Sequence, residues 1–227
     1  MSLFCSYDPN YIPMKRSIIF LSLTFLFCAA LFSQSREYKL NYEMKALGAN
    51  IGSLHLTMKK SNQDVYYHTK TLFHVNLLIK KVTMTVDNRV HYQNGQLLSA
   101  VNEVIVNGEL HSSANIKWED GKYRVEIDNE VQPDVTTPIR FSGSLLYWNE
   151  PSRVAKAFSE SSGAFMNIKS MNDGKYEIKD PINNRNMIFF YEGGNNTKVQ
   201  VKHPLVTISM IKQEEETALS KSELPNH

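Results

Sequence analysis

The sequence is poor in cysteine. Among its 227 residues the two cysteines are Cys5 and Cys28, and both precede Gln34. Cleavage of a leader near residue 33 would remove both, which excludes disulfides and thiol chemistry from the mature protein. The fold must then rest on an apolar core, and the residues that remain are enough for one sizeable domain.

The sequence also has little excess of one charge. Lys and Arg total 25 against 23 Asp and Glu, a formal net charge of +2 with both signs interspersed. Nothing electrostatic therefore points to nucleic acid as a partner.

Motifs that carry chemistry are missing as well. Ser142-Gly143-Ser144 lacks the Gly-x-Ser-x-Gly pattern of a nucleophile elbow, and Gly193-Gly194 is not followed by Lys-Ser or Lys-Thr as in a phosphate loop. The histidines show no His-x-His or His-x-x-x-His spacing that would preform a metal ligand pair. We therefore expect no enzyme activity, no metal and no cofactor.

What the chain does have is an apolar run near its start. Lys15 and Arg16 precede about 15 mostly apolar residues, Ile18 to Phe32, and polar sequence begins at Gln34. This pattern predicts a signal peptide over residues 1–33. Translation could instead start at Met14, in which case the start at Met1 is mis-assigned and residues 1–13 are not part of the protein. We expect export across the inner membrane to the periplasm or the outer membrane, with no transmembrane span after cleavage.

Most of the remaining sequence alternates apolar and polar residues with period two, which predicts strands with one dry face. The alternation covers Tyr38–Ala46 and returns repeatedly as far as Ile127. Asn94-Gly95, Asn107-Gly108 and Asp120-Gly121 suit two-residue hairpin turns, because both residue types accept positive φ.

The alternation stops near Pro133, and helical spacing is expected at about 142–158. Ser142 can cap a short helical turn, and Pro151 can open a second helix. These helices would plug the concave side of the sheet. The residues expected to line a ligand site there are Leu145, Leu146, Trp148, Val154 and Phe158.

The predicted fold is mostly β, a single strongly curved antiparallel sheet or open barrel of about a dozen strands with one or two short helices in its concavity. It forms one domain over residues 34–212, followed by a polar tail at 213–227. A membrane-spanning barrel fits poorly, since the helical insertion interrupts the meander.

The segment from Pro138 to Pro151, Pro-Ile-Arg-Phe-Ser-Gly-Ser-Leu-Leu-Tyr-Trp-Asn-Glu-Pro, lies between long hairpins and a terminal meander that begins after Gly163-Ala-Phe. This layout resembles an uncharacterised family of secreted bacterial proteins of unknown function. More loosely, it is similar to periplasmic half-barrels of the lipoprotein-carrier type, which cradle an acyl chain. Neither resemblance implies a catalytic residue.

Two functions follow as expectations. The first is an envelope protein that binds a lipid or another apolar or amphipathic ligand in the concave face. The alternative is a structural or protein-interaction module of the envelope, with a filled core and a protein partner. The amount of empty space beside the predicted helices decides between them.

Overall fold

The computed structural model describes residues 35–76, 81–182, 184–202 and 206–214. The expected signal peptide at 1–33 lies outside these residues, and so does the expected tail from residue 215 onward.

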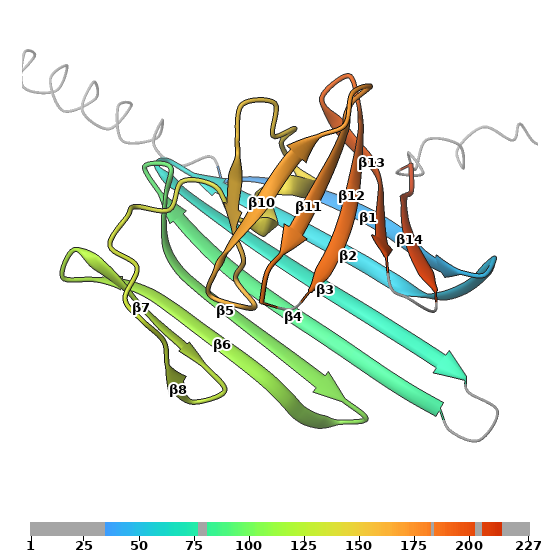
Figure 1. The fold of residues 1–227 in the computed structure, drawn as a ribbon, viewed down its shortest axis with the longest axis horizontal. Helices are drawn as coiled ribbons and strands as arrows, with labels where there is room; N and C mark the ends of the chain where they lie inside the picture. The colour runs from blue at the N-terminus through green and yellow to red at the C-terminus, as the bar shows by residue number, and fades with distance from the viewer. Residues whose placement is uncertain (1–34, 77–80, 183, 203–205, 215–227) are drawn as a thin grey trace, which may run out of the picture. The chain divides into compact units, whose positions relative to one another are not determined.

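In the described part of the chain, fourteen strands form one antiparallel sheet (Figure 1). The strand order is β8-β7-β6-β5-β4-β3-β2-β1-β14-β13-β12-β11-β10-β9, and within the described residues it does not close into a barrel. The strands are β1 (Arg36–Ala46), β2 (Ala49–Ser61), β3 (Asp64–Asn76), β4 (Lys81–Gln93), β5 (Gln96–Val106), β6 (Glu109–Glu119), β7 (Lys122–Ile127), β8 (Glu130–Val131), β9 (Lys156–Phe158), β10 (Phe165–Ser170), β11 (Lys175–Asp180), β12 (Arg185–Glu192), β13 (Asn195–Lys202) and β14 (Thr207–Lys212). The predicted fold class, a single curved antiparallel sheet, is confirmed.

Two meanders make up this sheet. The first runs outward from β1 to β8, and the second starts at the far edge with β9 and returns to β14 beside β1. The pairing of β1 with β14 joins them, with Tyr42 opposite Lys212 and Ala46 opposite Ile208. The short strands β10 to β13 lie across the face of the long strands (Figure 1).

The predicted hairpin turns are present. Asn94 and Gly95 have φ values of 52° and 73°, and Asn107 and Gly108 have 51° and 88°. Positive φ at both central residues gives the turn type whose twist matches that of paired strands. The local sequence therefore fixes where these hairpins reverse.

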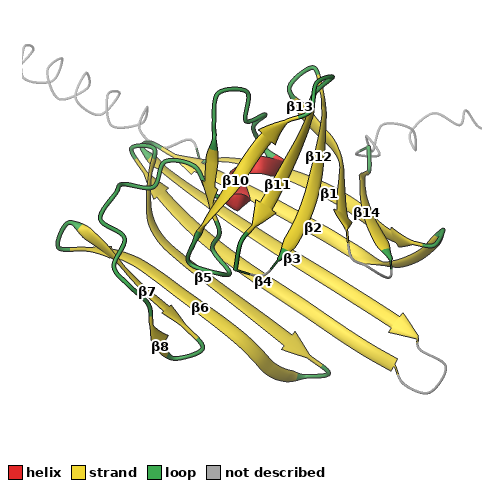
Figure 2. Ribbon diagram, viewed as in Figure 1, coloured by secondary structure: helices red, strands yellow, loops and turns green. Residues whose placement is uncertain are grey.

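The helical insertion at 142–158 is shorter than predicted. The described residues form one helix, the 3-10 helix η1 (Gly143–Tyr147), which lies against the sheet (Figure 2). The second helix expected from Pro151 is wrong: the chain turns there and enters β9, where Phe158 pairs with Phe165. The sequence over 154–158 is compatible with a helix face or with a short strand, and the hydrogen bonding with β10 makes residues 156–158 a strand.

Two clusters of buried side chains fill the concave side. One is formed by residues of β1, β2 and β9 to β14 and includes Leu146 of η1. The other is formed by residues of β2 to β7 and includes Ile139 and Phe158. Trp148, directly after η1, packs against both clusters. The plug predicted from sequence is thus present, with η1 and its flanking residues in that role.

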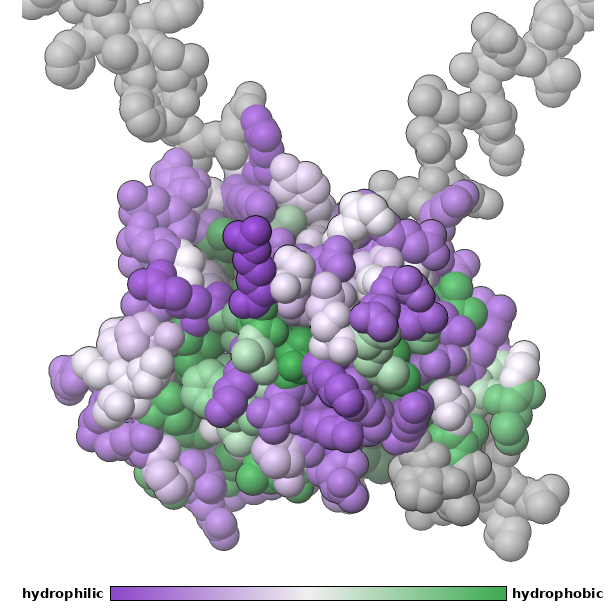
Figure 3. All heavy atoms as spheres, turned by 45° about the horizontal axis from the view of Figure 1, so that its top comes forward, coloured by the Kyte–Doolittle hydropathy of each residue, from purple (hydrophilic) through white to green (hydrophobic). Residues whose placement is uncertain are grey.

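The long strands are less covered where they extend beyond the second meander. Phe73, Met84, Val86 and Val104 are half-buried there. Figure 3 shows apolar surface in patches that polar side chains interrupt. The edge strands β8 and β9 have two and three residues, which leaves little backbone for pairing between molecules.

Gly52 is a position where the fold requires glycine. Its φ is +156°, and a Cβ at this position would overlap the carbonyl oxygen of Leu72 on β3. We expect Gly52→Ala to lower the free energy of unfolding by about 2–4 kcal/mol, because the β2–β3 pairing must shift. Urea unfolding measures the change.

The matched control is Gly108→Asn, in a hairpin turn where nothing lies within 4 Å of the built Cβ. Asn tolerates positive φ, so this variant is expected to stay within about 0.5 kcal/mol of the parent. Equal losses in the two variants would contradict the argument.

Candidate functional site

The candidate site lies where β1 and β14 separate. β1 pairs with β2 over Arg36–Ala46 but with β14 over Tyr42–Ala46 alone. Beyond these pairs, the backbone N–H of Gln213 donates one more hydrogen bond, of 2.8 Å, to the carbonyl oxygen of Asn41. Backbone groups alternate in direction along a strand, so those of Lys39 also point toward the side that β14 has left.

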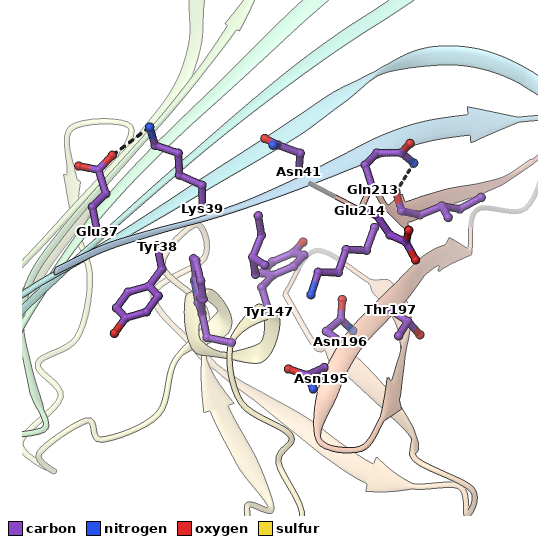
Figure 4. A pocket seen from close by; sticks show the side chains of 14 residues that line it. Glu37, Tyr38, Lys39, Asn41, Tyr147, Asn195, Asn196, Thr197, Gln213 and Glu214 are labelled. Atoms are coloured by element: carbon purple, nitrogen blue, oxygen red, sulfur yellow. Dashed lines mark hydrogen bonds and ion pairs between the residues drawn. The ribbon is translucent and has the colours of Figure 1, made fainter. Parts of the chain in front are cut away.

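A pocket of about 1020 Å³ occupies this opening. This lies at the upper end of the range of small-molecule sites, about 300–1,000 Å³. In Figure 4, Tyr38 and Tyr147 lie on one side of β1, and Asn195, Asn196 and Thr197, at the start of β13, lie on this same side. Lys39, Asn41 and Gln213 point to the other side of the sheet (Figure 4). Residues from both faces of β1 thus line the opening, and the aromatic ones lie on the face that carries the core.

Aromatic rings form most of the apolar part of the pocket, together with Leu40 and Ile211. The ring of Tyr147 is held edge-on between Tyr42 and Phe189, with centroid distances of 5.8 and 5.3 Å. Trp148 also lines the pocket, and its ring centroid lies 6.4 Å from that of Tyr67. These rings are fixed by the core, so an apolar ligand group would meet a preformed surface.

The wall opposite β1 is fixed by hydrogen bonds. The hydroxyl of Tyr42 donates to Oδ1 of the buried Asn196 at 2.9 Å. The Asn196 amide in turn donates to the carbonyl oxygens of Phe190 and Lys198. Both amide hydrogens of Asn196 are therefore used within the protein, and these bonds hold its side chain as part of the pocket wall.

Four charged residues line the pocket, and two of them are already compensated. Glu37 pairs with Lys39 at 3.2 Å and with Lys59 at 3.1 Å. Hydrogen bonds from Lys59 and then Lys39 hold the pKa of Glu37 below its usual value. Lys212 and Glu214 form no ion pair with any described residue. Lys212 is half-buried and Glu214 is exposed.

A buried carboxylate positions η1 beside the pocket. Glu160, 5% exposed, accepts hydrogen bonds from the Ser142 hydroxyl at 2.7 Å and the Ser144 amide at 2.9 Å. Ser142 does occupy the N-cap position, as expected, but makes no side-chain cap hydrogen bond of its own. A Cβ on Gly143 would lie 2.8 Å from Glu160 Oε2, so the carboxylate also needs a glycine there. Glu160 follows no sequence pattern, and sequence reasoning missed it.

The five residues expected at a ligand site separate in the structure. Leu146 and Phe158 are buried in the two clusters, and Leu145 packs against the second cluster. Val154 is half-buried. Trp148 is the member of the set that lines the pocket.

None of the histidines that the structure describes lines this pocket. His55, His68, His74 and His111 are exposed and His91 is half-buried, whereas His203 and His227 lie outside the described residues. His68 contacts Asp87 at 2.9 Å and His91 contacts Asp64 at 2.7 Å. Across the described ranges, no three His, Cys, Asp or Glu side chains come together as a metal site.

The helix content bears on the membrane. Of the helices formed by described residues, none is long and apolar enough to cross a bilayer.

Glu160 offers a test of how η1 is held. Glu160→Ala leaves a buried hydroxyl and a buried amide without their acceptor, so we expect the free energy of unfolding to fall by about 2–4 kcal/mol. Glu160→Gln keeps an acceptor oxygen and is expected to lose less. Glu192→Ala, at an exposed position of β12, is the control and should change stability by at most about 0.5 kcal/mol.

The tyrosines around the pocket predict a loss of stability in alkali. Burial raises the pKa of Tyr42 and Tyr191, and burial followed by the Glu160 carboxylate raises the pKa of Tyr147. The folded protein keeps these protons where the unfolded chain loses them, near pH 10. The free energy of unfolding should therefore fall as pH rises above about 10.

Urea unfolding over this pH range, with tyrosinate absorbance recorded in parallel, measures the effect. Tyr42→Phe removes one of the three phenols and should reduce the slope. Full ionisation of the tyrosines with the strand circular dichroism signal intact would contradict the prediction.

Comparison with known proteins gives a family and no individual relative. No curated protein and no solved structure matches the chain. A family described as a domain of unknown function, DUF6134, matches residues 42–213. The match includes Tyr147, Trp148 and Lys212 of the pocket, whereas the β1 edge from Glu37 to Asn41 precedes it. It covers most of the chain and confirms the resemblance to an uncharacterised family: the chain belongs to the DUF6134 family, whose function is unknown.

Proposed function

We propose that this protein is a secreted binding protein of the bacterial envelope, periplasmic or outer-membrane-associated, that holds an amphipathic ligand on the concave side of its sheet. The observation that supports the proposal is the pocket of about 1020 Å³ beside η1. Aromatic and aliphatic side chains line one part of it and polar groups line the rest, the combination that suits a ligand with an apolar body and a polar end.

The position of the pocket refines the expectation from sequence. The space directly beneath η1 is filled, because Leu146 and Phe158 are 1% and 0% exposed. A ligand would lie beside the plug, against Tyr147 and Trp148, and would reach the open edge of β1. Binding therefore requires no separation of the two core clusters.

Export supports the same proposal. The leader predicted at 1–33 would deliver the chain to a compartment bounded by membranes, where lipid-like molecules are abundant. Neither a catalytic motif in the sequence nor a described cluster of metal ligands suggests a reaction. We therefore expect the ligand to be bound and released unchanged.

A second candidate is an interaction module with a protein partner. The two filled clusters favour it, since the concave side is mostly occupied by the protein's own side chains. In this case the protein would carry no small molecule, and the unpaired edge of β1 would be the place where a partner strand could add.

Native mass spectrometry separates the two candidates. We expect protein purified from the envelope fraction of its own host to carry an added mass that organic solvent removes. Asn195→Trp places an indole in the pocket from an exposed position and should lower the loaded fraction several-fold.

The matched control is Asn115→Trp, exposed on β6 and outside the pocket. It should load as the parent does. Protein that is free of ligand in every preparation, with Asn195→Trp indistinguishable from the parent, would overturn the binding proposal and favour the interaction module.

A further inference from the structure

Lys212 differs from the other described lysines in its surroundings. Three lysines are half-buried in the described ranges: Lys45, Lys198 and Lys212. Lys45 pairs with Glu43 at 2.8 Å, and the Lys198 ammonium lies 5.5 Å from the centroid of the Phe190 ring. Lys212 has no ion pair, side-chain hydrogen bond or ring contact with any described residue.

Its direction follows from the strand register. Lys212 pairs with Tyr42 across β1 and β14, and paired residues project from the same face of a sheet. Tyr42 is 1% exposed and Met210, two residues before Lys212 on the same strand, is 6% exposed. The side chain of Lys212 thus projects to the core face, into the pocket that Tyr147 and Trp148 also line.

Lys212 is half-buried as a residue, and its ammonium has no partner among the described residues, so it can donate hydrogen bonds to a group that enters the pocket. The other charges at the pocket do not supply the partner. Glu37 is engaged by Lys39 and Lys59, and Glu214 is exposed and forms no ion pair with Lys212. The Lys212 ammonium is therefore available to an anion that enters the pocket.

We propose that Lys212 binds the anionic head, a carboxylate or a phosphate, of the amphipathic ligand. The head accepts hydrogen bonds from the ammonium, and the apolar body lies against Tyr147 and Trp148. This inference rests on the proposed function of the same pocket and narrows its ligand to anionic amphiphiles. Glu214 at the rim opposes the binding of such a head, and Lys212 at the half-buried position favours it.

The test uses four probes with the same ten-carbon chain: decanoate, decyl phosphate, decanol and decylammonium. Binding to the mature protein is followed by the fluorescence of Trp148 in a Trp118→Phe background, since Trp118 packs against the second cluster, away from the pocket lining. We expect the two anionic probes to bind about tenfold or more tightly than decanol, and decylammonium to bind weakest. The ratio of the affinities for decanoate and decyl phosphate shows whether the site prefers a carboxylate or a phosphate head.

Substitution of the lysine should remove this preference. Lys212→Met is expected to weaken the binding of decanoate about tenfold or more and to leave the binding of decanol unchanged. Lys212→Arg is expected to keep the preference for anionic probes. Lys70→Met is the matched control, since Lys70 is exposed on β3 and lies outside the pocket. Glu214→Gln should tighten decanoate binding.

The outcomes are separable. Equal binding of all four probes, with Lys212→Met unchanged, would overturn the role of Lys212 and leave the binding pocket standing. If no probe bound the parent protein, the proposed function would fail and this inference with it. The probe series uses one folded protein, so it decides the question even if a variant fails to fold.

Discussion

The pairing of β1 with β14 is the contact on which the rest of the structure depends. Five residue pairs join two meanders that would otherwise be separate sheets. The second meander can lie over the first because this seam fixes one side of it, and the two core clusters form between them. The seam is shorter than β1, and the part of β1 left unpaired forms one wall of the pocket. A single feature thus accounts for both the core and the opening in it.

Much of the fold could be predicted because its signals are local. Alternation along each strand and turns such as Asn94-Gly95 are determined by neighbouring residues. The pairing of β1 with β14 was out of reach, since two alternating strands far apart in the chain carry no sign of being neighbours. The error at Phe158 has the same origin: a strand of three residues is defined by its partner, β10, and its own sequence fits a helix equally well.

The site was less predictable than the fold. Trp148 was identified because an aromatic residue at the end of the plug has to lie near the concavity. Lys212 was missed, although a signal exists: Ile208, Met210 and Lys212 continue one alternation, which places a lysine on an inward face. Glu160 has no such signal. Its role depends on Gly143 and Ser144, which the fold brings beside it.

The strand order also has a consequence for assembly. The first described strand to be synthesised, β1, lies at the centre of the sheet and receives its second neighbour from the last, β14. The seam therefore joins segments separated by more sequence than any other pair of adjacent strands, and such distant contacts are slow to form. Until β14 arrives that edge of β1 stays unpaired, so the sheet is completed only after the last described strand has been synthesised.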